Sequence, residues 1–267
     1  MIREPAVAGQ FYPAHPESLR KSIRTYLGPG EPSLDAKGIV APHAGYMYSG
    51  AVAGAVYAAV RLPKRFIILG PNHTGGGAAL SLHPSGQWRT PLGLVGIDEE
   101  LNKHLTRECT LLVEDTAAHA REHSIEVQIP FLQLRADPMS FAAICIGTAD
   151  YASLETLGHA LGRVVKATPD PVLLVASSDM SHYEAADVAS RKDRFAIEKM
   201  VDVDPLGLYR TIFEKDVSMC GFAPTVALLT ACRDLGASRG QLVRYANSGD
   251  VSGDFDRVVG YAGMAVC

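Results

Sequence analysis

Two histidines and one cysteine have the residue types and the surroundings of a transition-metal site. His43 lies in APHAGYMYSG, directly after an apolar run, and His73 lies in GPNHTGG, after a second apolar run. Cys220 lies in MCGFAP, just before a stretch of helix-like composition. Imidazole nitrogen and thiolate sulfur are common ligands of iron, copper and zinc. The three residues therefore predict a metal site assembled from distant parts of the chain.

Each of these residues also has an ordinary structural interpretation. A single histidine after a strand is commonly a hydrogen-bonded loop residue, and a cysteine at a helix start is commonly a small packing residue. The two histidine turns are more informative together, because Pro42 and Pro71 stiffen them and neighbouring glycines let the backbone pack closely. For Cys220, the amides and dipole at the start of the next helix are expected to favour the thiolate.

Four further polar residues are the catalytic candidates. Asp179 and His182 lie in DMSHY, after a strong apolar run, and their spacing suits a carboxylate that orients or polarises an acid–base imidazole. Glu122 and His123 lie in REHSIEVQIPFLQ, at the start of a predicted helix on which Glu126 would share a face with Glu122. At such a start His123 and Ser124 can orient a metal ligand or bind an anion, and the alternative is a capped and solvated helix start.

The elements that must position these residues begin with short, continuously apolar runs. Such runs are typical of parallel strands covered by helices on both faces. The strand candidates are GIVAP at 38–42, RFIILG at 65–70, FAAICIG at 141–147, PVLLVASS at 171–178, LVRYANS at 242–248 and VVGYAGMAV at 258–266, with peripheral candidates at 94–97 and 111–115.

Helix-like stretches alternate with these runs. They cover 16–27, 49–60, 99–107, 122–134, 153–166, 185–200, 205–213 and 221–235, and Pro130 is expected to bend the fourth. The alternation predicts a three-layer α/β fold, with a mainly parallel or mixed central sheet and helices on both faces. Ligands of such sheets bind in the crevice beyond the carboxyl ends of the strands, which is where His43, His73 and His182 fall. The polar loop from Asn247 to Asp254 either closes over this crevice or binds the substrate, or else it forms an ordinary turn.

The composition narrows the class of protein. With 267 residues, of which 47% are hydrophobic, the chain can bury a large core, and no linker divides it, so we expect one domain over 1–267. A net charge of -4 without a basic cluster argues against nucleic-acid partners. No apolar run approaches the roughly 18 residues of a membrane span. Five cysteines without CxxC spacing fit reduced thiols, so a cytoplasmic location is expected.

Across nearly its whole length the sequence resembles the Memo family, the B component of the protein set named AmmeMemoRadiSam. The resemblance is carried, in the family's order, by REPAVAGQFYP, APHAGYMYSG, FIILGPNH, WRTPLG, EHSIEVQIPFL, SSDMSHY, MCGFAP and YANSGD. It implies a fold similar to class III extradiol dioxygenases, which are non-haem iron enzymes. It also implies that His43, His73 and Cys220 match the family's metal ligands.

The same resemblance implies properties of the surrounding pocket and of the partners. Glu122, His123, Asp179 and His182 match other residues that line the family's pocket. Members have been linked to iron or copper and, in eukaryotes, to cell motility and redox signalling. Partners implied by the family are an AMMECR1-like protein and a radical-SAM protein, and a homo-oligomer is also compatible with the family.

One departure from the dioxygenases bears on function. Those enzymes use two histidines and a carboxylate, whereas here a cysteine takes the third place. The leading hypothesis is a redox or dioxygenase-like enzyme that acts on a small molecule, with iron or copper as metal, His182 as acid–base group and Asp179 orienting it. The second is a non-catalytic protein that binds a metal, metabolite or peptide in the same crevice. The third is a zinc hydrolase with Glu122 or His182 as base.

Overall fold

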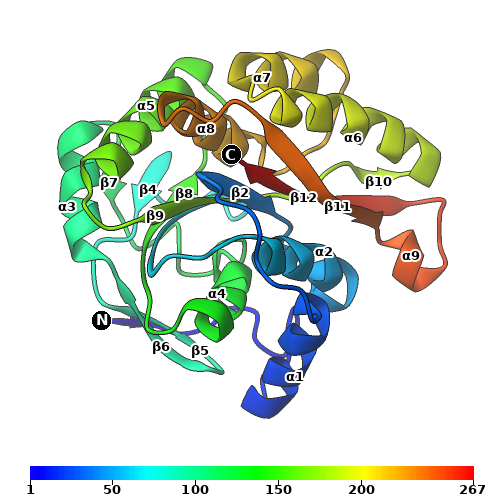
Figure 1. Cartoon of the computed structure of the whole chain (residues 1–267), viewed down its shortest axis with the longest axis horizontal. Helices are drawn as coiled ribbons and strands as arrows, with labels where there is room; N and C mark the ends of the chain where they lie inside the picture. The colour runs from blue at the N-terminus through cyan, green and yellow to red at the C-terminus, as the bar shows by residue number, and fades with distance from the viewer.

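The computed structural model describes residues 1–267, and its centre is a mixed twelve-stranded sheet (Figure 1). Three neighbouring parallel strands form the middle: β3 (Arg65–Pro71), β9 (Val172–Ser177) and β2 (Gly38–Ala41). Next to β3 lies the parallel strand β8 (Ser140–Ile146), and next to β2 lies the antiparallel strand β12 (Val258–Val266). All five were predicted as strands because their side chains are apolar on both faces.

The remaining strands extend or edge this sheet. They are β1 (Ile2–Arg3), β4 (Leu80–Leu82), β5 (Gln87–Thr90), β6 (Gly93–Ile97), β7 (Val113–Glu114), β10 (His182–Glu184) and β11 (Gly240–Asn247). The main order is β1-β5-β6-β8-β3-β9-β2-β12-β10, while β11 pairs with β12 and β4 pairs with β7 and β8.

Helices cover both faces of the sheet, as the sequence predicts (Figure 1). One face carries α3 (Glu99–Glu108), α5 (Tyr151–Ala167), α6 (Ala186–Val201), α7 (Pro205–Glu214) and α8 (Phe222–Asp234). The other carries α1 (Pro16–Leu27), α2 (Tyr46–Ala59) and α4 (Ile129–Ala136). Short helices η1 (Glu126–Gln128) and α9 (Gly249–Ser252) complete the chain.

Alternating side chains of the central strands belong to two separate hydrophobic cores, one on each face of the sheet. In β3, Ile67 and Leu69 belong to the core under α5 and α8, whereas Phe66 and Ile68 belong to the core under α1 and α2. Successive strand residues point to opposite faces, so one apolar strand stabilises both layers. This two-sided packing fixes the strand ends, which carry the polar residues. No helix is both long enough and apolar enough to span a bilayer.

The segment around Glu122 differs from its prediction. A helix was expected over 122–134, bent at Pro130, but residues before Glu126 are irregular, and Pro130 lies in the first turn of α4. Proline is well tolerated there, because the first helical amides lack partners inside the helix. Glu122 and Glu126 therefore do not share a helical face. Their carboxylates face different partners, His73 in one case and Arg3 in the other.

Candidate metal centre

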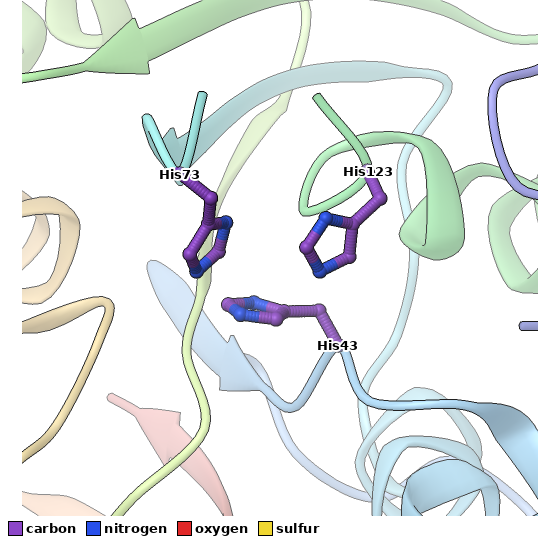
Figure 2. Close-up of side chains that lie close together, drawn as sticks. All are labelled: His43, His73 and His123. Atoms are coloured by element: carbon purple, nitrogen blue, oxygen red, sulfur yellow. The ribbon is translucent and has the colours of Figure 1, made fainter. Parts of the chain in front are cut away.

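Three histidines from separate segments meet beyond the carboxyl ends of the central strands. His43 follows β2, His73 follows β3, and His123 comes from the irregular segment before η1. Their ring centroids are 4.8 to 5.4 Å apart, and one candidate ligand atom from each lies within 4.8 Å of the others. Figure 2 shows the three imidazoles turned toward one another. The group could hold a metal ion.

Cys220 joins this group through His43. Its sulfur lies 3.2 Å from Nε2 of His43, and the backbone N–H of Asp179 donates to it at 3.3 Å. The expectation of a thiolate is wrong for the metal-free chain, because burial, together with the neighbouring Asp179 carboxylate, raises the pKa of Cys220. These effects outweigh the backbone amides that the sequence pointed to. A bound cation reverses the balance, since a coordinating thiol loses its proton.

The surroundings keep the ring of His43 neutral and fix its backbone. His43 is only 2% exposed, and burial, reinforced by the nearby imidazoles, holds its pKa well below the usual value. Oδ1 of Asp179 accepts the backbone N–H of His43 at 2.8 Å. Burial raises the pKa of Asp179 to about 6 in spite of this bond. A neutral imidazole has a lone pair available for a metal.

Glu122 holds His73. Its Oε1 lies 2.9 Å from Nδ1 of His73, and its Oε2 accepts the backbone N–H of the same residue at 2.6 Å. The backbone amides of His123 and Ser124 also donate to Oε1. Burial by itself would raise the pKa of Glu122, but the bonds from His73 and these amides lower it to about 2. The carboxylate is therefore ionised and fixes the His73 ring with Nε2 directed away from it.

His182 is oriented by a residue other than the one expected. Its backbone N–H donates to Oγ of Ser218 at 2.8 Å, and its Nδ1 lies 3.0 Å from the carbonyl oxygen of Ser218. Because a carbonyl only accepts, Nδ1 carries the proton and Nε2 is free. Asp179, the expected orienting group, instead accepts from the backbone of His43 and Ala44. No sequence signal pointed to Ser218.

Six of the seven predicted site residues line one pocket, and the seventh, Glu122, lies behind it. A pocket of about 520 Å³ is lined by His43, His73, His123, Asp179, His182 and Cys220, together with Phe11, Ala44, Gly45, Tyr183, Ser218 and Val259. Glu122 lies behind this lining at 1% exposure. The solvent exposure of the three imidazoles increases from His43, which is buried, through His123 to His73, which is exposed. The pocket therefore opens to solvent on the side of His73.

Two aromatic side chains, Phe11 and Tyr183, line the pocket, whereas the polar loop from Asn247 to Asp254 does not. The ring of Phe11 lies 4.7 Å from that of His123, and Tyr183, with a φ of 60°, is 68% exposed. Residues Asn247 to Asp254 form the end of β11, α9 and the turn toward β12, and none of them lines the pocket. The structure thus gives this loop the role of a turn between two antiparallel strands.

Comparison with known proteins agrees with the resemblance in the sequence. The Memo-like protein family model matches residues 3–265. A MEMO1 family protein of Methanopyrus kandleri is 45% identical over 278 residues, covering 99% of this chain and 98% of the relative. A MEMO1 family protein of Methanosarcina barkeri is 41% identical over 267 residues, covering 99% and 100%.

Among solved structures, an uncharacterized protein of Escherichia coli K12 has a similar fold. It matches with a TM-score of 0.50 at 12% identity, over 77% of this chain and 87% of that one. This likeness concerns the fold alone. The family, by contrast, is shown by matches that run almost from end to end at 40% identity or more, and the chain belongs to the Memo family.

Proposed function

We propose that this protein binds a transition metal, iron or copper in preference to zinc, and uses it in redox chemistry on a small molecule. The observation that carries the proposal is the convergence of three imidazoles and one thiol on an open pocket. The proposed ligands are His43, His73 and Cys220. A set of two imidazoles and one thiolate is softer than an all-oxygen site, which favours these metals over magnesium or calcium.

The residues present fit such a metal. His43 is neutral, and Glu122 occupies Nδ1 of His73, so each ring offers Nε2 as ligand atom. This arrangement, a carboxylate holding a ligating histidine, is a common feature of protein metal sites. Cys220 lies within hydrogen-bonding distance of His43 and so needs little movement to share a metal with it.

His123 supports an alternative ligand set. Its ring stacks on that of His73 with centroids 4.8 Å apart, and it completes a group of three imidazoles. In this alternative His123 replaces Cys220 as third ligand. The two sets share His43 and His73, so variants of Cys220 and His123 distinguish them.

The chemistry divides among the remaining pocket residues. A redox-active metal supplies electron transfer or activation of oxygen when it is bound. His182 faces the pocket with Nε2 free, so it can take a proton from a substrate or return it. Phe11 and Tyr183 offer aromatic surfaces to a small molecule at the mouth. A hydrolytic role for Glu122 has less support, because its two oxygens already accept four hydrogen bonds.

Metal analysis of protein purified without oxygen tests the proposal. We expect close to one iron or copper per chain, and oxygen uptake when catechol-like compounds are added to the iron form. Copper without turnover would support the alternative of a binding or delivery protein. A chain that neither retains a transition metal nor takes up Fe²⁺ or Cu⁺ from solution would contradict the proposal.

A further inference from the structure

Behind His43, on the side away from the pocket, lies a chain of buried polar groups. Nδ1 of His43 is 2.9 Å from Oγ of Ser177, the last residue of β9. Nε2 of Gln128 reaches the same Oγ at 2.8 Å, and the hydroxyl of Tyr57 donates to Oε1 of Gln128 at 2.8 Å. Ser177, Gln128 and Tyr57 are fully buried. None of them lines the pocket.

Backbone carbonyls fix the direction of these hydrogen bonds. The hydroxyl of Ser177 lies 2.7 Å from the carbonyl oxygen of Ser124, which can only accept, so the single Ser177 proton points there. The amide of Gln128 is fixed in the same way, because its nitrogen lies 3.0 Å from the carbonyl oxygen of Pro42. With the amide so oriented, its second proton points to Ser177.

The position of the proton on His43 follows. Oγ of Ser177 donates to Ser124 and accepts from Gln128, so its remaining lone pair faces Nδ1 of His43, which must donate. The opposite arrangement would turn the Ser177 proton to His43 and leave the buried carbonyl of Ser124 without a donor. A buried carbonyl without a hydrogen-bond donor raises the free energy of the folded state relative to one that has a donor.

We propose that Ser177 is a positioning residue that holds His43 in the Nδ1–H tautomer and so presents the Nε2 lone pair to the pocket. Gln128, anchored by Tyr57, holds Ser177 in place. The assignment of that lone pair to a metal rests on the proposed function, whereas the tautomer itself does not. Nε2 faces Cys220 at 3.2 Å, so in the metal-free chain the thiol donates to it, and a bound metal would take the place of that proton.

Nitrogen-15 NMR of the histidine rings in the metal-free protein tests the tautomer directly. We expect Nδ1 of His43 to show the signal of a protonated ring nitrogen and Nε2 that of an unprotonated one. In Ser177→Ala we expect a mixture of tautomers and a ten- to hundredfold loss of Zn²⁺ affinity, measured by competition with a chromophoric chelator. Ser177→Thr keeps the hydroxyl and should restore the wild-type signals.

The matched control is Ser81→Ala, which removes another fully buried serine that bonds a backbone carbonyl but touches no imidazole through its hydroxyl. It should leave the His43 signals and Zn²⁺ affinity unchanged. A proton on Nε2 in the wild-type chain would overturn the inference whether or not Ser177→Ala folds. A wild-type chain with the Nδ1 proton but no affinity for Zn²⁺, Fe²⁺ or Cu⁺ would uphold the tautomer and contradict the proposed function instead.

Discussion

Arg3 and Glu126 form a buried ion pair, with Nη1 of Arg3 2.6 Å from Oε2 of Glu126. Glu126 also accepts the backbone N–H groups of Ala6 and Val7 and the hydroxyl of Tyr12. The guanidinium of Arg3 in turn donates to the carbonyl oxygens of His119 and Glu122. These bonds tie the N-terminal segment to the irregular segment that carries Glu122 and His123.

We therefore expect Glu126→Ala to lower the free energy of unfolding by about 3–5 kcal/mol, because it leaves Arg3 buried without a counter-charge. Denaturant unfolding measures this. Asp187→Ala, which breaks the exposed pair with Arg191, is the control and should leave the free energy of unfolding nearly unchanged. Equal losses in the two variants would show that the buried pair has no special role.

Substitution of the proposed ligands should remove metal and spare the fold. We expect His43→Ala and Cys220→Ser to reduce the bound metal per chain at least tenfold, with circular dichroism unchanged, because ligands at a pocket contribute little to the core. His123→Gln should retain most of the metal. If His123→Gln loses metal and Cys220→Ser does not, the three-histidine set is the correct one.

Substitution of His182 should not reduce the metal content of the protein. Its ring is held by Ser218 and faces the pocket, so His182→Ala is expected to keep near-normal metal content. If the iron form turns over a substrate, the rate should fall by about 10²–10⁴ with a changed pH profile, since positioned acid–base groups contribute that much. Metal loss as large as in His73→Ala would place His182 among the ligands.

Two buried histidines outside the site should make the fold sensitive to acid. Burial lowers the pKa of His83 to about 4 and that of His119 to about 3, whereas an unfolded histidine titrates near 6.5. The unfolded chain thus binds more protons below pH 6.5. Stability is fully present above that pH and falls as the pH drops toward 4 and then 3, by roughly 3 kcal/mol for His83 and roughly 5 kcal/mol for His119.

Denaturant unfolding between pH 7 and pH 4 checks this dependence. His119→Gln, which keeps a donor for the carbonyl of Ser81, should flatten the acid side of the curve. His15→Gln alters an exposed histidine and should leave the slope as it is. Identical slopes in all three proteins would mean that His119 is not kept neutral by the fold.

The sequence was most informative where local pattern and topology agree. β2, β3 and β9 were predicted because their residues are apolar on both faces, and the meeting of His43 and His73 followed from the parallel order of such strands. The approach of His123 to these rings could not be predicted, because an expected helix is irregular before Glu126. Periodicity describes helices and strands but not the path of an irregular segment.

The groups that hold the site were the least visible in the sequence. Ser177 and Ser218 are ordinary residue types, and each holds a histidine that lies far away along the chain. Such roles depend on tertiary contacts, which no local pattern encodes. The predicted thiolate state of Cys220 was wrong for a related reason. The amides of the next helix could be inferred from the sequence, whereas the burial of the thiol could not.

The raised pKa of Cys220 has a consequence for the lifetime of the metal-free chain. Peroxides attack the thiolate far faster than the thiol, so a sulfur that stays protonated beside His43 resists conversion to sulfenic and sulfinic acids. In the metal-free chain the same burial that raises the pKa therefore also protects the sulfur from peroxide. A metal bound at Cys220 would take the place of that proton, because a coordinating thiol is deprotonated.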